Sequence, residues 1–226
     1  MARGPSSAGL AITAAIAAVF LLWARDSQAA SNAGAGEATD YPPPPPPDGF
    51  VTGDVLGADL DSQINAFLYM IRNAEHVPAA VRTGRDYGTF YGGASFSDFS
   101  DHPVLTGEKR GVPLPDEMCR AAGFGPGCVS TAAGAYQIIV PTWKRVRAAG
   151  SWGPRLNDFS IQSQDEAARR LLIESGALRQ LTAGNIPAAI EKASRIWASL
   201  PGSTAQQNPK PMGTVLAYFI DGGGVA

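Results

Sequence analysis

Hydrophobic residues recur at helical spacing in the segment that follows residue 60. Ile64, Phe67, Leu68 and Ile71 fall three or four positions apart, which is the spacing of one face of an α-helix. The pattern predicts a helix that runs to about residue 75, and the folded domain is expected to begin near Asp54 and to extend to residue 226.

The rest of the pattern predicts a short β region followed by more helices. Between residues 87 and 140, aromatic residues alternate with Gly, Ser and Asp, which is typical of short strands and turns. The chain shows no internal repeat, so we expect a mainly helical α+β domain with a small β-hairpin region. Later helices are predicted over residues 141–149, 163–175, 186–197 and 215–220.

Three signals mark the ends of these helices. Asp61 and Ser62 offer the side-chain oxygens of an N-cap for the first helix. The sequence Ser-Gln-Asp-Glu that begins at Ser163 is typical of a capping box. Gly176 is expected to end the helix that begins at residue 163, because glycine readily adopts the left-handed conformation found at a helix C-terminus. Trp197 shares a helical face with apolar neighbours and is predicted to lie in the core.

Glu75 is an acidic residue among the apolar positions of the first helix. At about 100° per residue it lies roughly 20° from Ile64 on the helical wheel, whereas Asn65, Arg72 and Asn73 occupy the other face. A carboxyl group on the apolar face loses water, and this raises its pKa toward the range in which it delivers a proton near neutral pH. The alternative is that the helix ends before Glu75 and leaves the side chain in solvent.

Composition limits the size of the protein and its partners. With 226 residues, 45% hydrophobic and 17% charged, the chain is long enough for one sizeable core but hardly for two, so we expect a single domain and a monomer. The formal net charge of −2 gives no basic excess, and nucleic acid is not an expected partner.

The cysteines and histidines favour a disulfide over a metal site. Cys119 and Cys128 have eight residues between them in a Gly- and Pro-rich stretch, which suits a disulfide that closes a hairpin; the alternative is two unpaired thiols in a reducing compartment. Metal-binding cysteines usually have two to four intervening residues. His76 and His102 do not flank the cysteines, so no metal site and no cofactor are expected.

The first thirty residues have the pattern of an export signal. An apolar, Ala-rich run over residues 8–24 follows a short basic start and precedes small residues. As a helix the run spans about 25 Å, less than the roughly 30 Å of a bilayer core. Two outcomes stay open: cleavage after Ala29, or retention as an anchor by residues 8–24. Either one predicts a periplasmic or secreted protein, and the second tethers it to the inner membrane.

Residues 31–53 are predicted to be a spacer. Small and acidic residues lead into six consecutive prolines, residues 42–47, which favour an extended polyproline helix of about 19 Å. A ligand for a proline-binding partner is the alternative.

Five ordered blocks between residues 63 and 202 are specific in combination. The first is Ala-Phe-Leu-Tyr-Met leading to Glu75, and the last is Ile-Trp-Ala-Ser-Leu-Pro-Gly; together they cover residues 66–75, 92–103, 130–137, 158–165 and 196–202. In these blocks the chain resembles the lambda-type phage endolysins, a lysozyme-like family of enzymes that cleave peptidoglycan.

The resemblance implies a lysozyme-like fold and a lytic transglycosylase whose catalytic acid is Glu75. The expected partner is the glycan strand of peptidoglycan, cut between N-acetylmuramic acid and N-acetylglucosamine. Glu75 protonates the bridging oxygen, the C6 hydroxyl of the muramic acid attacks, and a 1,6-anhydro end results. An internal nucleophile removes the need for the second carboxylate of ordinary glycosidases.

The block over residues 130–137 is the expected sugar-binding segment. On the resemblance, Gly134 permits close approach of the backbone to sugar, Tyr136 stacks on a ring, and Gln137 hydrogen-bonds an acetamido group, with Thr131 beside them. The alternative is a strand whose side chains fill the core.

Asp98 and Asp101 decide between two reaction types. If either is a second catalytic carboxylate, the enzyme is a hydrolytic muramidase; the alternative role is hydrogen bonding of the turns around His102. A non-catalytic peptidoglycan-binding module is the remaining alternative, and a buried Glu75 argues against it. Residues 105–129 look longer than the corresponding loop of the family, and we expect them to reshape the substrate cleft.

Overall fold

The computed structural model of the protein describes residues 54–121, 125–203 and 209–225. The predicted export segment (residues 1–30) and spacer (residues 31–53) lie outside the described residues, so cleavage, anchoring and localisation stay predictions. Within the described ranges, none of the helices has both the length and the apolar character needed to cross a membrane.

The described chain is mainly helical and carries a small antiparallel sheet, in agreement with the predicted α+β class. Strand β1 (Val112–Pro113) pairs with β2 (Val129–Ser130), and the 3-10 turns are η1 (Arg85–Gly88) and η2 (Tyr91–Gly93). The α-helices are α3 (Asp54–Glu75), α4 (Pro78–Arg82), α5 (Asp116–Ala121), α6 (Val140–Val146), α7 (Ile161–Ser175), α8 (Ala177–Thr182), α9 (Ile186–Ala193) and α10 (Met212–Asp221).

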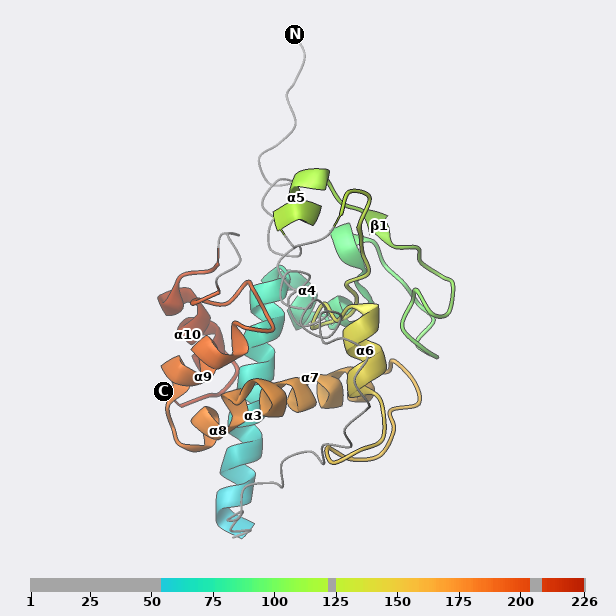
Figure 1. Ribbon diagram of the computed structural model, residues 1–226. Helices are drawn as coiled ribbons and strands as arrows, with labels where there is room; N and C mark the ends of the chain where they lie inside the picture. The colour runs from blue at the N-terminus through green and yellow to red at the C-terminus, as the bar shows by residue number, and fades with distance from the viewer. Residues whose placement is uncertain (1–53, 122–124, 204–208, 226) are drawn as a thin grey trace, which may run out of the picture.

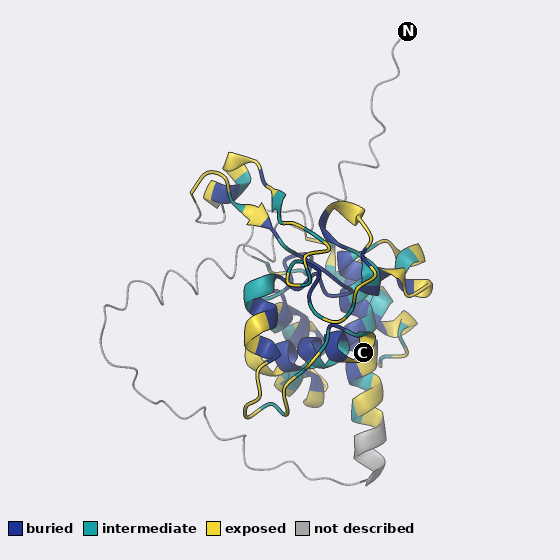
Figure 2. Cartoon of the chain, turned by 90° about the vertical axis from the view of Figure 1, so that its right-hand side faces the viewer, coloured by how far each residue is buried: buried dark blue, intermediate teal, exposed yellow. Residues whose placement is uncertain are grey.

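Helix α3 is the long central element of the fold (Figure 1). It packs against α10, α7 and α8, and the buried residues concentrate where these helices meet (Figure 2). Phe67 of α3 meets Phe219 of α10 edge to face, with 6.2 Å between ring centroids. Both rings are fully buried, and truncating a buried ring of this size costs about 3 to 5 kcal/mol of stability. The packing fixes α3, and with it the residue at its end.

Helix α3 differs from the prediction at its start and on its polar side. The N-cap predicted at Asp61 and Ser62 is wrong: the segment from Asp54 contains no proline, and the helix includes it. Asn73 was expected on a polar face but is buried, and its side chain donates to the carbonyl of Tyr69. The last turns of α3 are therefore enclosed on more sides than an amphipathic wheel predicts.

The later helices lie near their predicted places, with shifted ends. Ser160, and not Ser163, is the N-cap of α7, because its side chain accepts from the backbone N–H of Ser163. Gly176 ends α7 with φ of 77°, as predicted. Helix α9 stops at Ala193, and Trp197 is fully buried beyond it, as expected for a core residue. The one- and two-turn helices α4, α5 and α8 were not predicted, because they are too short to show a period.

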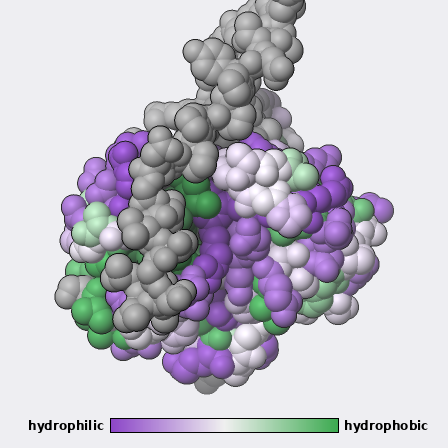
Figure 3. All heavy atoms as spheres, turned by 90° about the horizontal axis from the view of Figure 1, so that it is seen from below, coloured by the Kyte–Doolittle hydropathy of each residue, from purple (hydrophilic) through white to green (hydrophobic). Residues whose placement is uncertain are grey.

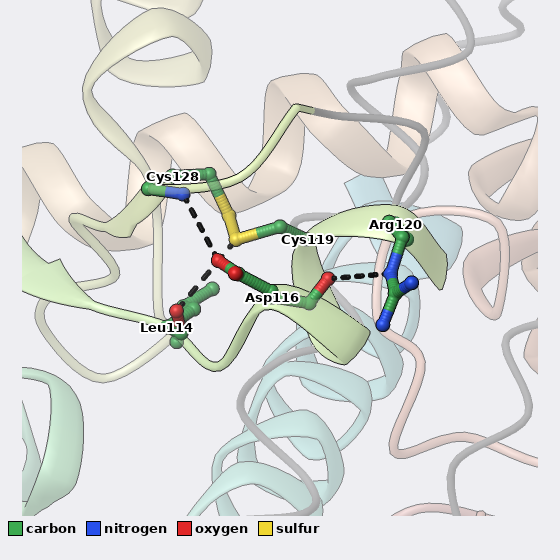
Figure 4. Close-up of a disulfide and its surroundings, with 6 residues drawn as sticks. Leu114, Asp116, Cys119, Arg120 and Cys128 are labelled. Atoms are coloured by element: carbon green, nitrogen blue, oxygen red, sulfur yellow. Dashed lines mark hydrogen bonds between the residues drawn. A yellow bond between two sulfur atoms is a disulfide. The ribbon is translucent and has the colours of Figure 1, made fainter.

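The cysteines link helix α5, which lies in the connection between β1 and β2, to the residue just before β2. Cys119 of α5 and Cys128 form a disulfide with Cα atoms 5.8 Å apart, so the pairing predicted from their spacing is present (Figure 4). The backbone N–H of Leu114, just after β1, donates to the carbonyl of Cys128, just before β2. The hairpin stands off the buried body in Figure 2 and has little core of its own.

On the face seen in Figure 3, hydrophobic residues form small groups between hydrophilic ones. The described large apolar side chains with substantial exposure are spread over the chain, and two of them, Ile161 and Ile173, lie near opposite ends of α7. They are Val77, Leu105, Val129, Ile161, Ile173, Ile220 and Val225.

Replacing both cysteines should destabilise the protein. The double variant Cys119→Ser/Cys128→Ser frees a short loop in the unfolded chain, which by loop-closure entropy lowers the free energy of unfolding by about 2 to 3 kcal/mol. Urea unfolding of both proteins, with and without a thiol reductant, measures this. The reductant should destabilise only the parent chain; equal stability of the parent chain and the variant would contradict a structural role.

Candidate active site

A pocket of about 590 Å³ opens at the end of α3. One wall comes from α3 and α4, the facing wall from residues 84–99, and Lys210 contributes from the segment before α10. Glu75 is the only acidic residue among the described residues that line the pocket. The lining residues are Ala74, Glu75, His76, Val77, Ala80, Gly84, Arg85, Gly88, Thr89, Gly93, Ser95, Phe96, Phe99 and Lys210.

Glu75 is the last residue of α3, and the local sequence explains why the helix ends there. Pro78 begins α4, and a proline disfavours the helical conformation of the residue before it, so Val77 is extended with ψ of 137°. The chain must therefore leave α3 within two residues of Glu75. The side chain of Glu75 is only 5% exposed, so the alternative that left it in solvent is wrong.

Glu75 has one polar partner and one free oxygen. The Ser199 hydroxyl donates to Glu75 Oε1 at 2.5 Å, whereas Oε2 has no hydrogen-bond partner among the described residues. Burial raises the pKa of Glu75 to about 7, and the Ser199 hydrogen bond and the charge of Lys210 act in the opposite direction. The carboxyl group is thus balanced between its two protonation states near neutral pH, as a group that gives and then takes back a proton requires.

A buried ion pair holds the wall opposite Glu75. Arg72 of α3 binds Asp86 of η1 through two hydrogen bonds, at 2.6 and 3.0 Å, and Asp86 is fully buried. The Arg72 guanidinium also lies over the ring of Tyr87, 4.4 Å from its centroid. Removing one partner would leave a buried charge unpaired, which costs about 3 to 5 kcal/mol. The pair fixes the distance between α3 and the wall of residues 84–99, because that wall has little regular secondary structure to hold it in place.

His76 also lines the pocket and is uncharged near neutral pH. Burial lowers its pKa, and its Nε2 lies 3.1 Å from the carbonyl oxygen of Gly134. A carbonyl only accepts, so Nε2 carries the proton and donates it. The basic charges of the described pocket lining therefore come from Arg85 and Lys210.

The structure gives Asp98 and Asp101 the turn-forming role, and neither lines the pocket. Asp98 is exposed and accepts from the backbone N–H and the hydroxyl of Ser100, which lower its pKa. Burial raises the pKa of Asp101, but donors outweigh it, and the net shift is downward. These donors are the Arg147 guanidinium, the Trp143 indole and the backbone N–H of His102.

The structure places the segment 130–137 behind the pocket wall and not on its surface. Tyr136 is 1% exposed and donates its hydroxyl to Asp165, so its ring has no face for a sugar, and the predicted stacking is wrong. Gln137 is fully buried and donates to the carbonyls of Gly134 and Thr89. Thr131 is half-buried and accepts from the backbone of residue 140. These side chains therefore fill the core, which was the alternative interpretation of this segment.

Gly134 does permit a close approach, but to another part of the protein. It has φ of 77°, and a Cβ atom there would lie 2.2 Å from Gln164 Oε1. The Gln164 amide accepts from the N–H of Ala135 and donates to the carbonyls of Tyr87 and Phe159. One side chain of α7 thus joins three segments behind the pocket.

Two site residues escaped sequence reasoning. Ser199 lies in the last of the five blocks, but nothing in the local sequence links it to a carboxyl group 124 positions earlier. No feature of the sequence marked Lys210 as a site residue. The long region 105–129 contributes no residue to the described pocket lining, so its expected effect on the cleft is not seen.

Comparisons with known proteins identify the family. The family model described as Endolysin matches residues 65–226. The endolysin of Escherichia phage lambda is 33% identical over 168 residues, which cover 74% of this chain and 94% of that protein. The endolysin of Escherichia phage P2 is 35% identical over 130 residues, which cover 58% and 70%.

Solved structures give the fold. Bacteriophage lambda lysozyme complexed with a chitohexasaccharide matches with a TM-score of 0.59 and 34% identity, over 73% of this chain and 96% of that one. A second structure, the lysozyme from bacteriophage lambda, matches with a TM-score of 0.57 and 32% identity. The fold is lysozyme-like, as the resemblance implied. The chain belongs to the endolysin family, whose members are enzymes that degrade peptidoglycan.

The raised pKa of Glu75 makes stability depend on pH. The native state holds this proton more tightly than the unfolded chain, where the pKa is the ordinary 4.5, so the free energy of unfolding falls as pH rises from about 4.5 to 7. Glu75→Gln removes this loss and keeps an acceptor for Ser199. The variant should be more stable than the parent chain by about 3 kcal/mol at pH 8, and by less than about 1 kcal/mol at pH 5. Urea unfolding at both pH values measures this; a difference that is the same at both would contradict the raised pKa.

Asp101 and Asp98 should differ in what their loss affects. Asp101→Asn replaces an acceptor of three donors, one of them charged, and is expected to cost about 1 to 3 kcal/mol of stability. Asp98→Asn serves as the matched exposed control. Thermal unfolding should separate the two variants. Asp98→Asn should keep its wall-degrading activity, and Asp101→Asn should keep most of it per folded molecule, because neither residue lines the pocket. A loss of about a hundredfold or more in either folded variant would show a second catalytic carboxylate.

Proposed function

We propose that this chain is a peptidoglycan lytic transglycosylase that cuts the β-1,4 bond between N-acetylmuramic acid and N-acetylglucosamine. The observation that carries the proposal is the single buried carboxyl group of Glu75, with a raised pKa and a free oxygen, in a pocket whose described lining holds no second acid. Membership of the endolysin family supplies the substrate class.

The reaction needs one group that is first an acid and then a base. Protonated Glu75 donates through Oε2 to the glycosidic oxygen, the bond from that oxygen to C1 of the muramic acid breaks, and positive charge develops at C1. The C6 hydroxyl of the same sugar attacks C1 and returns its proton to the Glu75 carboxylate. A 1,6-anhydro ring forms and no water is consumed. Ser199 stays on Oε1 and stabilises the carboxylate while it is charged.

The arrangement of carboxylates supports this route over hydrolysis. A retaining glycosidase needs two carboxyl groups about 5 to 5.5 Å apart, and an inverting one about 6.5 to 9.5 Å apart. Asp98 and Asp101 are engaged with Ser100 and with Trp143 and Arg147, away from the pocket lining. An internal hydroxyl nucleophile fits a site with one acid.

Two further features support a wall-degrading role outside the cytoplasm. A relative of known structure carries a chitohexasaccharide, a polymer of N-acetylglucosamine, which supports a glycan strand as the ligand of this chain. The pattern of residues 1–30 supports export, cleaved or retained as an anchor by residues 8–24, toward the compartment where peptidoglycan lies.

Mass spectrometry of the products tests the proposal. The chain is incubated with purified peptidoglycan beside Glu75→Gln, which keeps the shape of the side chain and has no transferable proton. We expect anhydro-muramic ends, about 18 Da lighter than hydrolytic ends because no water is added, and a loss of at least about a thousandfold in rate in the variant.

Other outcomes have definite meanings. Reducing muramic ends would mean a hydrolytic muramidase and overturn the transglycosylase. Glycan binding by the parent chain without products would mean a binding module. Full activity of Glu75→Gln would remove Glu75 from the reaction. Circular dichroism of the variant confirms that the fold is kept.

A further inference from the structure

Two cations stand in the pocket around Glu75. Arg85 belongs to the wall of residues 84–99 and is exposed, and its Nε donates to the hydroxyl of Thr83. Lys210 is half-buried on the other side and forms no ion pair within the described residues. The proposed function uses neither charge.

The backbone of Lys210 is fixed close to the catalytic group. Its N–H donates to the carbonyl of Ser199 at 2.9 Å, and the Ser199 hydroxyl donates to Glu75. Pro209 and Pro211 flank it, and prolines restrict the backbone on both sides. Pro211 is also the N-cap of α10, which is packed on α3. The ammonium group thus moves only over the reach of its own side chain.

The charge of the pocket favours a ligand that carries an anionic group. When substrate binds, Glu75 carries a proton and is uncharged, and His76 is neutral, so the described lining is cationic. The N-acetylglucosamine units of the glycan have no charge to meet it. In peptidoglycan the muramic acid, whose C1 reacts, also carries a peptide stem with free carboxylates. Those carboxylates are the anions that complete the site.

We propose that Lys210 is a specificity-determining residue that pairs with a carboxylate of the peptide stem on the muramic acid bound beside Glu75. The chain therefore cleaves peptidoglycan whose stem carboxylates are free in preference to peptidoglycan whose carboxylates have been converted to amides. This inference rests on the proposed glycan cleavage at Glu75, and it adds the part of the substrate that the enzyme recognises.

A second role for Lys210 has a different signature. Its charge also acts on Glu75, so losing it alters the proton affinity of the acid. Such an effect changes the pH profile and the rate on every substrate alike. Pairing with the stem changes KM only on substrate with free stem carboxylates, and it weakens with salt, because a partly exposed ion pair is screened.

The experiment compares four full-length proteins on two substrates. The proteins are the parent chain, Lys210→Met, the conservative Lys210→Arg, and Lys144→Met as a control at an exposed lysine of α6 that does not line the pocket. The substrates are peptidoglycan and the same peptidoglycan after a carbodiimide and ammonia have converted its free carboxylates to amides. The stems are kept in both, because removing them with an amidase would leave a new carboxylate on the lactyl group of each muramic acid. Strand cleavage is followed by chromatography, whatever the chemistry of the new ends, over a range of pH and salt.

The parent chain should show a kcat/KM about tenfold higher on unmodified than on amidated peptidoglycan, the scale of one partly desolvated charge pair. Lys210→Met should lose this preference through KM on the unmodified substrate, together with its salt dependence. An effect of the variant on Glu75 changes the rate on both substrates by the same factor and leaves the ratio of the two kcat/KM values unchanged. Lys210→Arg should restore most of the preference, and Lys144→Met should match the parent chain.

Equal kcat/KM of the parent chain on the two substrates would overturn the proposal. An equal loss on both substrates in Lys210→Met, with a shifted pH profile, would also overturn it and assign Lys210 to Glu75. These failures are distinct from failure of the proposed function, in which the parent chain leaves both substrates uncut or produces only hydrolytic ends.

Discussion

The burial of one carboxyl group is the constraint around which this structure is arranged. Glu75 lies at the end of α3, and the same packing of α3 against α7, α8 and α10 that forms the core carries its side chain out of water. Burying a carboxyl group with a single neutral donor is unfavourable. A helix packed along most of its length can offset this unfavourable free energy at its last residue, whereas an isolated turn could not.

The rest of the site is positioned by polar contacts between distant segments, because its walls have little regular structure. The Arg72–Asp86 pair fixes one wall to α3, and Asp101 ties the following turns to α6 through Trp143 and Arg147. Both sets are well hydrogen-bonded, so they specify one geometry as well as contributing stability. The disulfide hairpin, by contrast, lies outside the pocket and affects stability more than chemistry.

The sequence predicted what depends on local pattern, and it missed what depends on contacts across the fold. Glu75, Gly176 and the disulfide follow from spacing and residue type, and the structure has them where expected. Tyr136 and Gln137 were assigned to sugar because an aromatic ring and an amide look the same in sequence whether they face a ligand or other parts of the protein. Tyr136 donates to the Asp165 carboxylate, and Gln137 donates to backbone carbonyls. Ser199 meets Glu75 only through tertiary packing, which no local periodicity records.

Gln164 shows how far from the reacting bond the enzyme depends on a single side chain. Its amide joins Ala135, Tyr87 and Phe159, and Gly134 must lack a side chain to admit it. The positions of the three segments therefore depend on the same side chain, and loss of Gln164 would affect all three together. The shape of the pocket is thus maintained by contacts behind its walls, at a distance from the bond that is cut.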